Sequence, residues 1–263
     1  MAKFAVAAPL ALATVAAVST DALAVTLKVT IESLAPIEGT FLTPTWVGFH
    51  DGTFDLYDRD VSLDGFGGME ELVEDGDNGP LSARFASEQA SGVDGTIFGS
   101  DILPIAPGDV TSALFDVDPS NQYFSYAAMV LPSNDAFIAN GNPLAFEIFD
   151  DMGNFVGTDF IVAGSQVLDG GTEVNDEAEF STAFLGQTVP NSGTPEGGVV
   201  TEHPGFIDGG RILAAFPNGD FTADGYQVVR ITVEKVPEPA TVMGLLALGG
   251  SMLAMGRRRK VGA

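Results

Sequence analysis

Glycine and proline interrupt this chain so often that a bundle of long helices has no room to form. Its 263 residues include 32 Gly and 15 Pro, and globular proteins contain only about 7% glycine. Apolar and polar residues alternate with a period of two in residues 25–31, and again in residues 226–234. This period is typical of half-buried β-strands. The chain is therefore predicted to be all-β, with 45% apolar residues to build a core.

Further strands are predicted in short apolar runs that are each bounded by Gly, Pro, Asn or Asp. They are residues 46–49, 113–117, 123–131, 144–149, 155–162 and 211–216. A hairpin turn is expected at residues 150–154, and the only helix of the domain at residues 69–75, ended by Gly76. About eight strands with one minor helix favour an antiparallel β-sandwich. The Gly- and Pro-rich residues 186–210 are expected to form a long surface loop.

The first 24 residues have the pattern of a signal peptide. Lys3 precedes an apolar run over residues 4–18, and Ala22-Leu23-Ala24 provides the small residues that signal peptidase requires, with Ala22 and Ala24 at the cleavage site. We therefore expect the chain to be exported through the inner membrane and cut by signal peptidase. The lack of cysteine excludes disulfides, zinc ribbons, iron–sulfur clusters and thiol nucleophiles.

The last 28 residues, 236–263, contain a second export-related pattern. Residues 240–256 carry no charge and are just long enough to span a membrane as an apolar helix. A basic cluster follows, which places that end in the cytoplasm. The pattern closely resembles the bacterial PEP-CTERM sorting signal. The matching residues are Pro237, Glu238 and Pro239 before the apolar segment and Arg257, Arg258 and Arg259 after it.

This resemblance implies a particular route out of the cell. An exosortase would recognise the signal and cleave near Pro237-Glu238-Pro239. The chain would contact the inner membrane only transiently, through its C-terminal helix, and would end at the cell surface or in the extracellular matrix. A permanent tail anchor is the alternative reading of the same segment.

Loss of both ends makes the remaining domain, residues 25–235, more acidic. The whole chain has 36 acidic and 11 basic residues, a net charge of −25; the two ends hold two of the acids and five of the bases, which leaves −28. Such a charge repels polyanions, so nucleic acid is not an expected partner. It is consistent either with binding of divalent cations or with adaptation to high salt.

Two loops place oxygen ligands directly after predicted strands. Asp135 follows residues 123–131, and Asp169 and Glu173 enclose a Gly-Gly-Thr turn. Calcium binds six to eight such oxygens at about 2.3–2.6 Å. The alternative is that Asp135 and Asp169 only cap turns by accepting backbone N–H groups. Spacing alone leaves both interpretations open, because acidic loops are abundant in this chain.

These loops also carry a resemblance to the spondin N-terminal domain family, in its bacterial branch. Residues 129–138 and 168–173 are similar to the two signature loops, residues 50–52 with 69–77 to the early segment, and residues 105–108 to the Pro-Gly turn. The similarity spans nearly all of residues 25–235. It implies a C2-like sandwich of eight strands that binds one calcium ion at one end.

In that family three carboxylates hold the calcium ion, and they correspond here to Asp135, Asp169 and Glu173. Two positions depart from the animal domains. Ala136 stands where those have Trp, and Glu173 where they have Asp. The longer Glu side chain can still bind calcium, but recognition through the Trp does not transfer.

No catalytic motif is present, so the protein is not expected to be an enzyme. His50 and His203 are the only histidines, and no nucleophile can be paired with either. The expected function is an exported calcium-binding module for adhesion or interaction at the cell surface or in the extracellular matrix, with an extracellular polysaccharide or a surface protein as partner. The alternative is an extracellular polysaccharide-binding or polysaccharide-processing protein. An exposed Trp46, the only Trp, would favour sugar binding, and a buried one would favour the spondin-type module.

Overall fold

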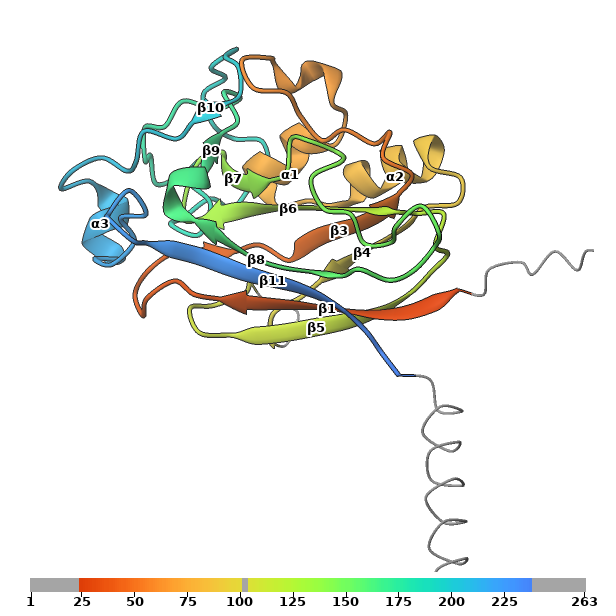
Figure 1. Cartoon of the computed structure of the whole chain (residues 1–263). Coiled ribbons are helices and arrows are strands. Elements are labelled where there is room, and N and C mark those ends of the chain that lie inside the picture. The colour runs from red at the N-terminus through yellow and green to blue at the C-terminus, as the bar shows by residue number, and fades with distance from the viewer. Residues whose placement is uncertain (1–23, 101–103, 238–263) are drawn as a thin grey trace, which may run out of the picture.

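The computed structural model describes residues 24–100 and 104–237. Within these residues the strands form two antiparallel sheets that pack face to face, so the predicted β-sandwich is confirmed (Figure 1). Eleven strands are present in the described residues, against about eight expected. No helix in this part of the chain has the length and apolar character needed to cross a membrane. Residues 1–23 of the predicted signal peptide and the apolar helix predicted at residues 240–256 lie outside the described residues.

The first sheet contains both of the strands predicted at the ends of the domain. Its order is β5 (Val110–Val117), β1 (Val25–Ser33), β11 (Gln227–Lys235) and β8 (Thr158–Ala163). In β1 every second side chain enters the core, because the other face of this sheet is in contact with solvent. Leu27 of β1 pairs with Lys235 of β11, which places the first and last strands side by side.

The central strands of the second sheet are buried on both faces. Its strand order is β10-β9-β7-β6-β3-β4, with β2 paired to β6. The strands are β2 (Phe41–Leu42), β3 (Thr45–His50), β4 (Val93–Ile97), β6 (Tyr123–Leu131), β7 (Ala136–Ala139), β9 (Leu168–Asp169) and β10 (Thr201–Glu202). Because β6 has neighbours on both faces, eight of its nine residues are buried, which explains its continuous apolar sequence.

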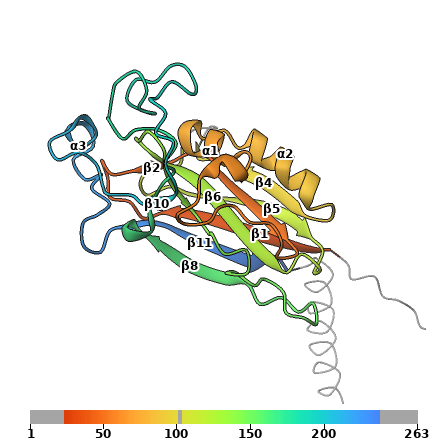
Figure 2. The same ribbon diagram turned by 90° about the horizontal axis from the view of Figure 1, so that it is seen from above.

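Two helices form a third layer over the outer face of this second sheet. They are α1 (Met69–Asp75) and α2 (Gly79–Glu88), and they lie above β3 and β6 in Figure 1 and beside them when seen from above in Figure 2. The helix predicted at residues 69–75 is thus confirmed, with Gly76 in the left-handed conformation that ends it. Phe85 of α2 packs edge-on against Trp46 of β3, so the helical layer has its own apolar core.

Three sequence predictions are wrong. Residues 211–216 form the short helix α3 (Arg211–Ala215), because Arg, Leu and Ala favour helix and only Ile212 needs burial. Residues 144–149 make isolated bridges at Glu147 and Phe149 but no strand. The prediction of a single helix is also wrong, because α2 follows the helix at residues 69–75. Pro80 is compatible with α2 because it lies in the first turn, where its missing N–H costs nothing.

The expected turn at residues 150–154 is present. The N–H of Asp150 donates to the carbonyl of Asn154 at 3.0 Å, and Phe149 and Phe155 form an isolated bridge on either side. Two 3-10 turns, Leu63–Gly65 and Gly164–Gln166, complete the regular elements of the described chain.

Candidate metal centre

Strand pairing in the second sheet brings two of the predicted ligands together. Asp135 lies in the short loop between β6 and β7, and Asp169 is the last residue of β9. Strands β7 and β9 are antiparallel, and Ala136 is the direct partner of Asp169. Two carboxylates that lie 34 positions apart in the sequence therefore become neighbours at one edge of the sheet.

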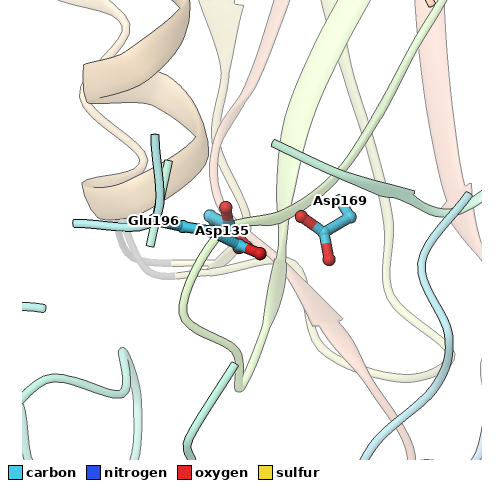
Figure 3. A group of neighbouring side chains, drawn as sticks. All are labelled: Asp135, Asp169 and Glu196. Atoms are coloured by element: carbon cyan, nitrogen blue, oxygen red, sulfur yellow. The ribbon is translucent and has the colours of Figure 1, made fainter. Parts of the chain in front are cut away.

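The third carboxylate of this group is not the one that the sequence suggested. Ligand atoms of Asp135, Asp169 and Glu196 all lie within 4.8 Å of one another (Figure 3). Asp135 and Asp169 are buried and Glu196 is exposed. Glu173 is not part of this group, although it is close: its backbone N–H donates to Asp135 Oδ2 at 3.1 Å. The structure thus joins Asp135 with Asp169 and adds Glu196 from a distant loop.

Asp135 has one occupied and one free carboxylate oxygen. Its Oδ2 accepts hydrogen bonds from the N–H and the hydroxyl of Thr172, at 2.9 and 3.2 Å, and from the N–H of Glu173. Its Oδ1 is buried and has no hydrogen-bond partner. Turn capping, which the sequence left as an alternative, therefore accounts for one oxygen only. A buried oxygen without a partner is costly, and a bound cation would satisfy it.

Asp169 is held in place by its own loop. Its Oδ1 accepts the N–H of Gly171 at 2.8 Å, and its Oδ2 accepts the side-chain amide of Asn175 at 2.6 Å. Each oxygen of an ionised carboxylate can accept a second interaction. The carboxylate is therefore oriented by the turn while keeping capacity for an ion.

The carboxylates in this region repel one another, and burial makes their charged forms less stable. Burial, together with the nearby Asp169, raises the pKa of Asp135 to about 7. Burial also raises the pKa of Glu173 to about 7, and the charge of Asp135 adds to this effect. Burial and then Asp169 raise the pKa of Glu196. In the described chain the salt bridges of Arg84, Arg211 and Arg230 go to other acids.

The loop that supplies Glu196 is fastened over the centre. The N–H of Glu196 donates to the carbonyl of Thr172 at 2.8 Å, and the N–H of Gly193 donates to Glu173 Oε1 at 2.6 Å. At Gly193 a Cβ atom would overlap the carboxylate of Glu173, so only glycine permits this approach. Residues 186–210 were expected to be a surface loop, but Val200 and His203 within them are buried.

Both histidines are buried, and a backbone N–H fixes the ring of each. His50 is buried, and its Nδ1 accepts the N–H of Gly52 at 3.0 Å, so in the neutral ring Nε2 carries the proton. That proton is donated to Ser125 Oγ at 2.8 Å. The ring cannot also remove a proton from Ser125, as a catalytic base would. Burial lowers the pKa of His50 to about 4.

His203 shares only the first of these contacts, because its Nε2 is buried without a hydrogen-bond partner. Its Nδ1 accepts the N–H of Gly205 at 3.0 Å, and burial lowers its pKa to about 4. The only Trp is also unavailable to a ligand. Trp46 is fully buried, and its indole N–H donates to Ser82 and Asp94. A sugar-stacking role for Trp46 is therefore excluded by its position in the core.

Comparison with known families identifies the C-terminal pattern. Residues 235–260 match the PEP-CTERM protein-sorting motif. A search of curated proteins finds no match to the chain. Of the predicted sorting residues, Pro237 is exposed just beyond β11, and those from Glu238 onward lie outside the described residues. The motif is recognised by exosortase and indicates export and sorting to the cell surface. The chain is accordingly an exported protein that carries an exosortase sorting signal.

Proposed function

We propose that the exported domain is a calcium-binding, spondin-type module that acts without catalysis in adhesion or interaction at the cell surface or in the extracellular matrix. The observation that supports calcium most directly is the free, buried Oδ1 of Asp135 beside Asp169 and Glu196. Carboxylate oxygens are the ligands that calcium prefers. A cation at this point would neutralise charges that no basic side chain of the described residues pairs with in a salt bridge.

Calcium would have a structural role in this proposal. Asp135, Asp169 and Glu196 belong to three separate segments, which an ion would hold together at one end of the sandwich. The ordered loops would then present a surface to a partner, either a protein or an extracellular polymer. The polysaccharide-specific alternative receives no support from Trp46, which is buried.

A thermal unfolding experiment on the purified full-length chain tests the proposal. Calcium at 100 times its dissociation constant stabilises by about 2.7 kcal/mol, which raises the melting temperature of a domain this size by roughly 5–10 °C. The variants Asp135→Asn and Asp169→Asn should lose this increase. Asp159→Asn removes an exposed charge far from the centre and should keep it. An equal calcium response in all four proteins would show that the ion binds elsewhere.

The interaction role needs a separate measurement. Cells that display the wild-type protein should adhere to one another or to matrix polymer in calcium and detach when the ion is chelated. Cells that display Asp135→Asn should not adhere in either condition. Adhesion that is the same with and without calcium would contradict the proposed role of the ion.

A further inference from the structure

The sorting motif begins inside the folded domain. Its match starts at Lys235, which is also the last residue of β11. Lys235 pairs with Leu27 of β1, and the N–H of the next residue, Val236, donates to the carbonyl of Thr26 at 2.9 Å. The first two residues of the motif are therefore held against the first sheet.

A shallow groove of about 570 Å³ lies beside this point. The pairing of β8 with β11 ends at Thr158 and Val233, and in the described chain no residue of β8 pairs with Glu234 or Lys235. The end of β11 thus extends beyond β8. The groove is lined by this end and by the segment that leads into β8, residues 232–235 and 155–159.

The surface of the groove combines an exposed apolar side chain with a fixed backbone. Val156 is 59% exposed, and its N–H donates to the carbonyl of Ile148 at 2.8 Å. At Gly157 a Cβ atom would lie 2.9 Å from the ring of Phe155 and 3.0 Å from the carbonyl oxygen of Val233, so glycine permits this close approach. A surface that is already ordered can be bound by a partner protein without the entropic cost of ordering it.

The length of chain beyond the groove limits how an enzyme can reach the motif. Pro239 is the fourth residue after Lys235, and an extended chain spans at most about 3.6 Å per residue. The Pro-Glu-Pro part of the motif therefore lies within roughly 15 Å of the end of β11. Stable protein interfaces involve about 20–30 residues on each side, far more than this short peptide. Exosortase, which recognises the motif, must then come against the neighbouring surface of the domain.

We propose that exosortase docks on this groove while it binds the motif, so that recognition includes residues of the folded domain outside the motif. Val156 would be the apolar contact. The paired end of β11 would fix the direction in which the motif leaves the sheet. This inference concerns sorting and is independent of the proposed calcium site.

Processing of the full-length chain in cells that contain the exosortase tests the inference. Its rate is the rate at which newly made chains lose the C-terminal segment, followed by intact mass. Val156→Arg fills the groove with a large charged side chain and should slow processing by about tenfold. Val110→Arg is the matched control, because Val110 is 65% exposed and pairs with Glu32, at the other end of β1 from Leu27. The control should be processed at the wild-type rate.

Two further changes separate the groove from the motif itself. Glu234→Tyr also fills the groove from outside the motif, and it supports the result if Val156→Arg does not fold. About ten Gly and Ser residues inserted between Glu234 and Lys235 keep the motif whole but let it move away from the groove. This insertion should slow processing as well, and Val156→Arg added to it should slow processing no further.

The outcomes decide the role of the groove. Slow processing of the groove variants and of the insertion, with a wild-type rate in Val110→Arg, would support docking. Wild-type rates in both groove variants, or in the insertion, would overturn it. An equal loss in Val110→Arg would also overturn it, because the effect would then come from surface charge in general. A groove variant that changes the oligomeric state but not processing would overturn it and assign the groove to a second copy of the chain.

Discussion

The sandwich buries two polar regions that differ in how well their atoms are paired. Around His50, the ring donates to Ser125, and Asn140 donates to the same hydroxyl at 3.0 Å while its oxygen accepts the N–H of Tyr126 at 2.9 Å. At the acidic end, Asp135 Oδ1 and Glu173 Oε2 have no partner. The first region is complete with protein atoms alone, which is typical of a structural network. The second is complete only with an added ion or proton.

The largest difference between these regions should appear when a side chain is removed from the complete one. His50→Ala leaves a cavity and deprives Ser125 of its bond, so the free energy of unfolding should fall by about 3 kcal/mol. The loss should be the same with and without calcium, as measured by urea unfolding. If calcium restored the stability of His50→Ala, the two regions would be coupled, and the comparison would fail.

A change of pH should act on the acidic region in the opposite direction from ordinary acid denaturation. Burial raises the pKa of Asp135, Glu74 and Glu173 to about 7, whereas unfolded carboxyls titrate near 4. Between about pH 8.5 and 6.5 the folded chain alone takes up protons, so its stability without divalent ions should rise, by on the order of 2 kcal/mol.

The histidines set the lower limit of this pH window. The pKa values of His50 and His203 are lowered to about 4, so they reduce stability only as the pH falls below their unfolded value, near 6.5. Calcium should abolish the stability gain above that point, because the ion replaces the protons. The free energy of unfolding is measured by urea unfolding at each pH. Equal pH profiles in calcium and in chelator would contradict the proposed ion site.

A smaller change, in calcium affinity, should show whether Glu196 or Glu173 binds the ion at the candidate metal centre. Glu196→Gln removes a ligand of the candidate centre, and calcium affinity there should fall about tenfold, which corresponds to about 1.4 kcal/mol. Glu173→Gln should leave the affinity of that site within a factor of about three, or about 0.7 kcal/mol. Titration calorimetry on both variants makes the comparison. The reverse order of affinities would restore the assignment made from the family resemblance.

The smallest effect is expected where acid pairs with base on the surface. Asp159 and Arg230 form an exposed salt bridge on the first sheet. Exposed pairs contribute little to stability, so Arg230→Ala should lower the free energy of unfolding only slightly and leave calcium binding unchanged. A larger loss in urea unfolding would show that surface charge matters more to this domain than burial of its acids.

The sequence predicts those parts of the fold in which periodicity and burial agree. Strand β1 alternates because one face is in solvent, and α1 ends at a glycine whose conformation only glycine adopts readily. Strand β9 has two residues, too few to show a period. Helix α3 was predicted as a strand because its short apolar run fits either structure, and only its surroundings decide between them.

The candidate site was predictable in part for a similar reason. Asp135 follows β6 and Asp169 ends β9, and the family resemblance names both residues. Glu196 lies between Pro195 and Gly197 in a long loop, and nothing distinguishes it among 36 acidic residues until the loop folds back. A contact between distant segments therefore decides this ligand.

Pairing of the first strand with the last gives the domain a direction. Because β1 begins where β11 ends, the two chain ends leave the sandwich together, while β6 runs toward the opposite end, where Asp135 follows it (Figure 1). Both export cleavages would thus lie at the same end of the domain. If the chain is held at a surface through its sorting segment, the end of the domain that contains Asp135 points away from that surface. The calcium concentration that matters is then that of the surrounding medium.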